Sequence, residues 1–122
     1  MATVVTNVGE ERVVDYLDAS VSTTSDTPHW VGSGTGASVA AEGDTVIETE
    51  TTDARANGVT SQPSADTMRV VGTITYGTSA TIANAGTLTS SSAGTLFLHG
   101  DFTGVAVLVN DQIQFTLNTQ IT

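Results

Sequence analysis

The sequence predicts a mainly β protein, an antiparallel β-sandwich or barrel preceded by one short N-terminal α-helix. Runs rich in β-branched residues recur at intervals of about ten residues, separated by Gly, Asn, Ser and Asp. The longer runs alternate apolar with polar residues, which is the period of a half-buried strand. No strand-like run is followed by a helix of useful length, which argues against a parallel α/β sheet.

The helix is expected within residues 6–20, TNVGEERVVDYLDAS. Asn7 is the expected N-cap, and Glu10 follows at the spacing of a capping box. An apolar stripe at helical spacing follows, made of Val13, Val14 and Leu17 with Tyr16 beside them. Polar residues then connect the helix to Pro28. We therefore expect two parts: the N-terminal helix with its polar connection (1–24) and a β-sandwich domain (25–122).

Six runs are expected to form the strands of this domain. They are HWVGS (29–33), DTVIETETT (44–52), TMRVVGTITYGT (67–78), GTLFLHGDF (94–102), TGVAVLVND (103–111) and DQIQFTLNTQIT (111–122). The alternation in the third run places Met68, Val70, Gly72, Ile74 and Tyr76 on one face. The segment TSSSAG (89–94) has the composition of a flexible loop tip.

Three glycines at alternate positions, Gly32, Gly34 and Gly36, follow the only tryptophan of the chain, Trp30. The spacing differs from that of the dinucleotide-binding fingerprint, and the segment lacks the Gly-Lys-Ser/Thr of a P-loop. We expect these glycines to serve a tight turn or a close approach of two backbone segments.

The charge balance excludes several classes of partner. The chain has 13 acidic residues, three arginines and no lysine, for a formal net charge of −10. Such a surface repels phosphates, so neither nucleic acid nor an anionic membrane is an expected partner. No apolar run is long enough to span a bilayer, and the N-terminus lacks the pattern of a secretory signal. The lysine-free, acidic composition favours a halophilic source.

The titratable residues do not form a convincing catalytic or metal site. The chain has no cysteine, and its two histidines are His29 and His99, the latter two residues before Asp101. A His-x-Asp pair lacks a specified third ligand or nucleophile, and Glu48 and Glu50 are expected on a solvated strand edge. We therefore predict no enzymatic activity and no cofactor. Calcium bound by the loop acids Asp44, Asp101 and Asp111 stays an open alternative.

Taken together, several segments resemble a family of small virion proteins of tailed viruses and prophages. The similarity covers nearly the whole chain. Its elements are an Asn-x-Gly helix start, Trp30 to Gly36, Gly43 to Glu50, Arg69 to Tyr76, Ile82 to Leu88, Gly94 to Leu98 and Asp111 to Leu117. One departure is Asn84, because that family often has an acid at this position before Ala-Gly.

The resemblance implies a structural component of the virion without catalysis. We expect a capsid decoration or minor capsid protein, with a tail or tail-fibre-associated subunit as the alternative. Its expected partners are the major capsid protein or tail proteins and further copies of itself, as a homo-oligomer in a virion assembled in the host cytoplasm. The composition adds that the virus infects a haloarchaeon or another halophile. The side chains expected to contact partners are Val13, Tyr16, Leu17 and Trp30.

Two other function classes stay open beside this one. A module that binds carbohydrate or a host surface needs exposed aromatic side chains, and the chain offers one Trp and two Tyr. A hydrolase on a β-scaffold needs polar groups that converge in a pocket.

Overall fold

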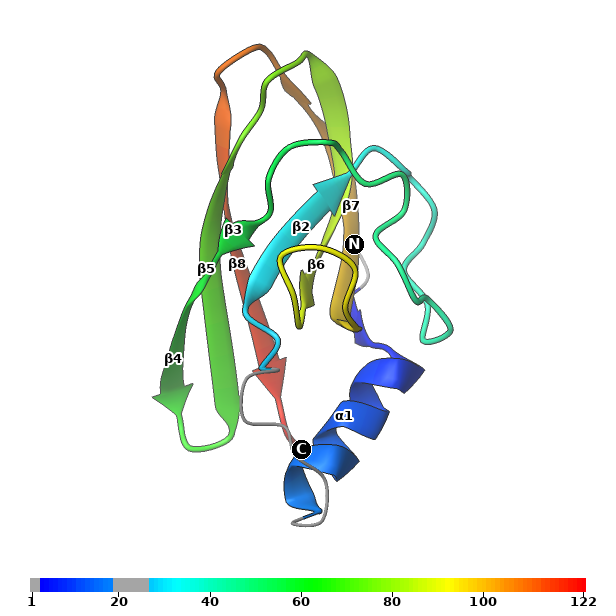
Figure 1. The fold of residues 1–122 in the computed structure, drawn as a ribbon, viewed down its shortest axis with the longest axis vertical. Helices are drawn as coiled ribbons and strands as arrows, with labels where there is room; N and C mark the ends of the chain where they lie inside the picture. The colour runs from blue at the N-terminus through cyan, green and yellow to red at the C-terminus, as the bar shows by residue number, and fades with distance from the viewer. Residues whose placement is uncertain (1–2, 19–26) are drawn as a thin grey trace.

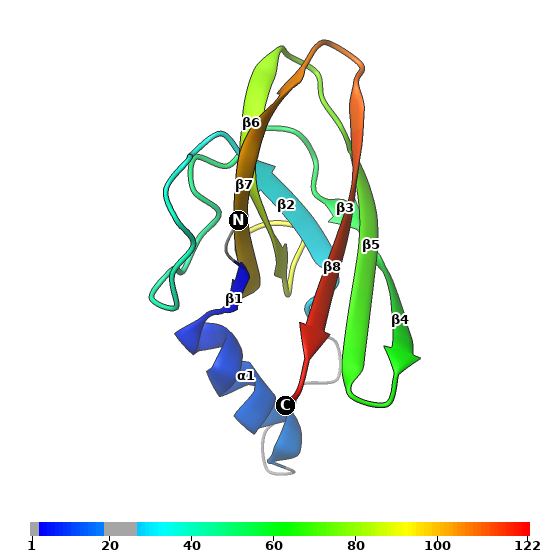
Figure 2. The same ribbon diagram turned by 180° about the vertical axis from the view of Figure 1, so that it is seen from behind.

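The fold is a two-layer antiparallel β-sandwich with one helix at one end (Figures 1 and 2). It comes from a computed structural model that describes residues 3–18 and 27–122. The helix is α1 (Asn7–Leu17). The strands are β1 (Thr3–Val5), β2 (Trp30–Gly34), β3 (Ala56–Asn57), β4 (Val59–Ser64), β5 (Thr67–Thr75), β6 (Ala80–Leu88), β7 (Leu96–Val107) and β8 (Gln112–Gln120).

The strands form two separate sheets. The larger sheet has the order β1-β7-β6-β2-β3, and the smaller one the order β4-β5-β8. Every pair of neighbouring strands is antiparallel. The predicted mainly β fold with one short N-terminal helix is therefore confirmed, and because the two sheets stay separate, the architecture is a sandwich.

Three expected strands are confirmed. The short apolar run 29–33 overlaps β2, and the alternating runs 67–78 and 111–122 contain β5 and β8. The predicted inner face of β5 is confirmed, since Val70, Gly72 and Ile74 are buried while Thr73 and Thr75 are exposed. The loop expected at residues 89–94 connects β6 to β7.

Other expectations about strands were wrong. Residues 44–52 form no strand: they belong to a loop that touches β2 through a single bridge between Gly34 and Glu50. In this loop Ile47 is buried and Val46 is exposed. The β-branched residues that suggested a strand therefore include one side chain that anchors the loop, and they do not form a hydrogen-bonded strand. The runs 94–102 and 103–111 form one strand, β7, which continues through Gly100 and Gly104. The strands β1, β3, β4 and β6 were not predicted.

The N-terminal segment is joined more closely to the sandwich than the sequence predicted. Residues 3–5 form β1 and pair with β7, so a piece of the expected N-terminal part (1–24) belongs to the larger sheet. The N-cap of α1 is Thr6 and not Asn7: the Thr6 hydroxyl accepts from Gly9 N at 3.0 Å and donates to Leu96 O at 2.6 Å. The polar connection expected after the helix, from residue 19, and the boundary at residue 24 lie outside the described residues.

The main core lies between the two sheets. Val70 and Ile74 of β5 and Phe115 of β8 pack against the larger sheet, whose buried members include Val31 and Ile82. Tyr76 is fully buried, and its hydroxyl lies 2.7 Å from Ser33 Oγ. Burial raises the pKa of Tyr76, and the hydrogen bond with Ser33 offsets part of the rise. A second cluster, Ile47, Leu88 and Leu96 with Trp30 beside it, anchors the 35–55 loop.

Among the described residues, no helix has the length and apolar character needed to cross a membrane.

Candidate functional site

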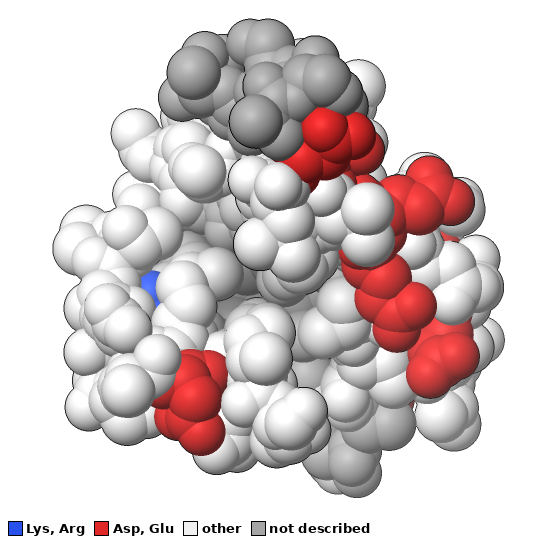
Figure 3. All heavy atoms as spheres, turned by 90° about the horizontal axis from the view of Figure 1, so that it is seen from below, with Lys and Arg blue, Asp and Glu red and all other residues white. Residues whose placement is uncertain are grey.

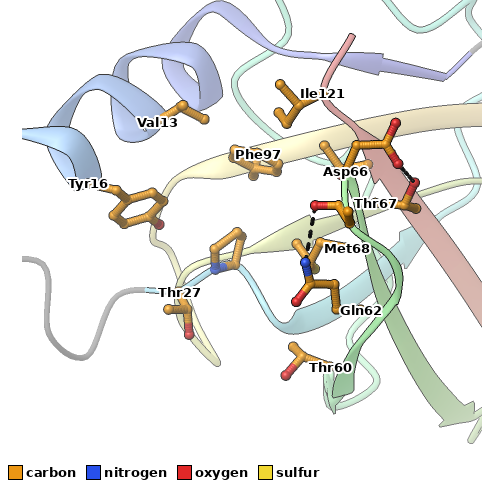
Figure 4. Close-up of a pocket in the computed structure, with 13 residues that line it drawn as sticks. Val13, Tyr16, Thr27, Thr60, Gln62, Asp66, Thr67, Met68, Phe97 and Ile121 are labelled. Atoms are coloured by element: carbon orange, nitrogen blue, oxygen red, sulfur yellow. Dashed lines mark hydrogen bonds between the residues drawn. The ribbon is translucent and has the colours of Figure 1, made fainter.

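An apolar groove opens at the helix end of the sandwich, and we call it the α1 groove (Figure 4). Its volume is about 730 Å³. Val13 and Tyr16 face it from α1, Phe97 from β7 and Met68 from β5. The remaining lining residues are Thr27, Pro28, Thr60, Gln62, Ala65, Asp66, Thr67, Thr119 and Ile121. The first turn of α1 lies closest to the sheet: Gly9 is the only fully buried residue of the helix, and a Cβ there would meet the backbone of Phe97.

The structure brings together two of the four side chains expected to contact partners. Val13 and Tyr16 line the α1 groove, one helical turn apart. Leu17 is 83 % exposed on the same helix and does not line the groove. Trp30 lies on β2, half-buried against the second core cluster and with its ring centroid 5.4 Å from that of His29. Trp30 therefore belongs to a different part of the surface from the helix.

Acidic side chains lie around this end of the molecule, while the hollow itself is mostly uncharged (Figure 3). The helix contributes Glu10, Glu11 and Asp15, together with Arg12, which lies over the Tyr16 ring at 5.3 Å. Among the residues that the structure describes, Asp66 is the one acidic side chain that lines the α1 groove. The site is thus an apolar depression in a negatively charged setting.

Asp66 ties the β4–β5 turn to the C-terminal end of β8. Its carboxylate accepts hydrogen bonds from Gln120 Nε2 at 3.0 Å, Ser64 Oγ at 2.8 Å and Thr67 Oγ1 at 3.0 Å. These bonds favour the ionised form and lower its pKa from 3.8 to about 2. Its backbone oxygen also accepts from Ile121 N at 2.9 Å.

The low pKa of Asp66 predicts a loss of stability in acid. Because the folded-state pKa lies below the unfolded value, the stabilisation is fully present above about pH 4 and is lost as the pH falls toward about 2. We expect an NMR titration of the Asp66 carboxyl carbon to give a midpoint near 2, and Asp66→Asn to flatten this part of the stability curve. A midpoint close to that of a free aspartate would contradict the assignment.

A buried polar chain of three side chains, Asp44–His99–Asn84, fastens the 35–55 loop to the larger sheet. His99 is 2 % exposed, with Nδ1 2.7 Å from Asp44 Oδ2 and Nε2 3.0 Å from Asn84 Oδ1. Asn84 is fully buried and donates from Nδ2 to the backbone oxygens of Gly36 and Glu48 at 3.0 and 2.9 Å. An aspartate at position 84 could not make these two donations.

The partners of His99 occupy both of its ring nitrogens. Because the Asn84 amide nitrogen donates to two carbonyls, its oxygen is the atom that faces His99 Nε2. The Asp44 carboxylate faces Nδ1 at 2.7 Å. A hydrogen bond from Ala41 N, partly offset by burial and reinforced by His99, lowers the pKa of Asp44.

This arrangement leaves His99 without a free nitrogen for proton transfer or metal ligation. His99 and Asp101, considered above as a His-x-Asp pair, have different partners: both ring nitrogens of His99 face Asp44 and Asn84, and Asp101 accepts from Ala40 N at 2.8 Å. Each of the three acids considered for calcium accepts from a different backbone N–H: Asp44 from Ala41, Asp101 from Ala40 and Asp111 from Leu108. Within residues 3–18 and 27–122, no group of three or more His, Cys, Asp or Glu side chains could hold a metal ion.

The two glutamates that were expected on one strand edge, Glu48 and Glu50, lie in the 35–55 loop and hydrogen-bond other residues of that loop. Glu48 accepts from the backbone and hydroxyl of Ser38, and Glu50 forms a two-bond contact with Arg55 at 2.7 and 2.9 Å.

The glycine series marks a close approach of two backbones. A Cβ on Gly34 would collide with Glu48 O, and one on Gly36 would collide with the Glu48 side chain. None of the three glycines has a positive φ. Of the two structural roles expected for them, close approach is therefore the one that the structure shows.

Sequence reasoning missed several groove residues. Met68 could have been found from the sequence, because it is the first apolar residue on the inner face of β5 and such an end position is often only partly covered by the core. Phe97 and Ile121 could not have been found in this way, because the sequence around them does not indicate which end of the sandwich the helix packs on.

Searches against models of known protein families, against curated proteins and against solved structures found no match for this chain.

Proposed function

We propose that this chain is a non-enzymatic structural protein of a virion, a capsid decoration or minor capsid protein of a tailed virus that binds and stabilises the shell. A tail or tail-fibre-associated subunit is the alternative. The observation that carries the proposal is the α1 groove, an apolar depression on a chain of net charge −10. Leu17, on the last turn of the helix that borders the groove, is a further solvent-facing apolar side chain, at 83 % exposure.

The charge around the groove indicates the chemistry of the partner. A shell protein that inserts one apolar side chain or a short apolar segment would fill the hollow between Tyr16 and Met68. Lysines or arginines beside that segment would meet the acids of α1 and Asp66. Cations must come from the partner because this chain has three arginines and no lysine.

The chemistry of the buried polar chain supports a structural role over an enzymatic one. His99 is the one histidine with a carboxylate partner among the described side chains, and both of its nitrogens are used inside the protein. These contacts hold the 35–55 loop against the sheet, and they leave no ring nitrogen of His99 available to accept a proton from a substrate.

The proposal is tested by binding to particles that lack this protein. We expect Val13→Asp to reduce co-sedimentation with such particles by about tenfold or more, since it places a charge in the groove wall. The matched control is Val14→Asp, one residue along the helix but outside the groove, which should bind nearly as wild type. Deleting the N-terminus is a poorer test, because residues 3–6 are part of the larger sheet.

Location within the virion separates the two alternatives. Gold-labelled antibodies against the purified protein should decorate the shell of intact particles, and labelling confined to the tail would favour the tail-associated subunit. The chain's absence from purified particles would refute both.

A further inference from the structure

The strand β8 has a free edge. Over Gln112–Gln120 it pairs with β5 in one unbroken register, and no other strand of the described chain lies beside it. Figure 2 looks onto this side of the sandwich, with β8 bordering one sheet and β7 with β1 bordering the other. A free edge exposes a row of backbone N–H and C=O groups that a further strand can pair with.

The other edge strands of the two sheets, β4, β1 and β3, are short or irregular, and β8 is neither. On the opposite side of the same sheet, β4 contains Pro63 and a register shift between Ser61 and Ser64. The edges of the larger sheet, β1 and β3, have three and two residues. Natural proteins block edge pairing by proline, bulges, charge or short length. β8 has nine residues with no proline, no charge and no shift in register.

The charge distribution also favours contact at this sheet. The strands β4, β5 and β8 contain no acidic residue and one cation, Arg69, in a chain with 13 acids. The outward side chains of β8 are Gln112, Gln114, Thr116, Asn118 and Gln120. Two copies of a chain with net charge −10 repel each other least where the charge is lowest.

The backbone hydrogen bonds at both ends of the β5–β8 ladder show which residues face the free edge. Tyr76 N donates to Asp111 O and Ile121 N donates to Asp66 O, each at 2.9 Å and in the register of the ladder. Bonded pairs alternate along an antiparallel ladder. The odd-numbered residues of β8 therefore bond to β5, and the even-numbered residues direct their N–H and C=O groups to the free edge.

From these observations we propose that β8 pairs with β8 of a second copy of this chain, antiparallel and across a two-fold axis at Thr116. Thr116 then lies opposite Thr116 of the second copy, and Gln114 opposite Asn118 of the second copy. The two small sheets join into one continuous sheet, and the contact is self-complementary, as a two-fold interface requires.

The same contact covers a second hollow, of about 280 Å³, at the open side of the sandwich. It lies between β8 and the β7–β1 edge, and its lining includes Phe102, Phe115 and Leu117. Phe102 and Leu117 are partly exposed in the single chain. Burial of these side chains by a second copy adds an apolar contribution to the strand pairing.

Sedimentation of the full chain in molar salt tests the proposal. We expect a concentration-dependent dimer of twice 12.4 kDa. Thr116→Pro removes an N–H at the free edge, which β5 does not use, and should raise the dimer dissociation constant about tenfold or more. The control is Thr60→Pro, on the opposite edge strand, where the alternation of bonded pairs places the Thr60 N–H away from β5. It should dimerise as wild type.

Charge variants at the axis give a test that does not depend on proline. At the lowest salt that keeps the protein folded, Thr116→Lys and Thr116→Glu should each be monomeric, and their equimolar mixture should form a heterodimer. Thr73→Lys, on the same face but on the inner strand β5, should dimerise as wild type. In hydrogen exchange, the amides of Gln114, Thr116 and Asn118 should be protected in the wild-type dimer, and those of Gln114 and Asn118 should exchange quickly in Thr116→Pro.

A monomeric wild-type chain, or a Thr116→Pro variant that dimerises as tightly as wild type, would overturn the pairing. The contact needs no shell protein, and Val13→Asp should leave it unchanged. Failure of shell binding and failure of dimerisation are therefore separate results.

Discussion

Replacing His99 with alanine is expected to lower the free energy of unfolding by about 3 kcal/mol and the melting temperature by roughly 10 °C. The substitution leaves the Asp44 carboxylate without its His99 partner and Asn84 Oδ1 facing a cavity. The value lies at the lower end of the range for broken buried pairs because the Asp44 side chain is 30 % exposed. Chemical unfolding at neutral pH measures the effect.

The matched control for this prediction is His29→Ala. Within the described chain, the hydrogen bonds of the His29 side chain go only to Thr27 in its own turn, so its removal should change stability by less than about 0.5 kcal/mol. If His99→Ala were as stable as wild type, the Asp44–His99–Asn84 chain would not be what fastens the 35–55 loop. If the buried charge is what matters, His99→Gln should recover little of the loss, since an amide is uncharged.

Replacing Gly34 with alanine is expected to destabilise the fold by about 3 kcal/mol. The new Cβ would collide with Glu48 O and lie 2.8 Å from Thr49 O, and both atoms belong to backbone that cannot rotate away. The bridge between Gly34 and Glu50 and the hydrogen bond from Gly36 N to Glu48 O should loosen with it. We expect faster hydrogen exchange at Gly36 and Thr51 together with a lower melting temperature.

Gly43→Ala provides the comparison, because no atom lies within 4 Å of a Cβ built there and its φ is not positive. It should be neutral or stabilising by a few tenths of a kcal/mol through the entropy of the unfolded chain. Equal effects at Gly34 and Gly43 would show that loss of glycine itself, and not the contact between two backbones, is responsible.

The parts of the fold that could be predicted are those where local pattern and tertiary contact agree. β5 and β8 alternate cleanly because one face of each packs on the core and the other meets solvent. β6 lies in the middle of the larger sheet and is buried from Ile82 to Leu88, so it has no alternation to detect. The three-residue β1 is specified by its partner β7, about ninety residues away, which no local pattern can reveal.

The residues of the candidate site likewise include some that the sequence predicted and some that it could not. The apolar stripe of α1 predicted Val13 and Tyr16 as surface contacts, and the structure places both on the groove wall. The sequence could not show that Leu17 points elsewhere or that Trp30 belongs to a core cluster. The partner of His99 was missed because Asp44 lies in a loop, and a loop carries no periodicity from which a contact can be inferred.

The pairing of β1 with β7 has a consequence for folding during synthesis. Thr3–Val5 and the Thr6 cap have their partners at residues 96–100, near the other end of the chain. While the ribosome is still translating, the N-terminal strand has no partner, and the helix beside it has no backbone to dock against. This end of the molecule therefore closes late, after the hairpin of β6 and β7 has left the exit tunnel.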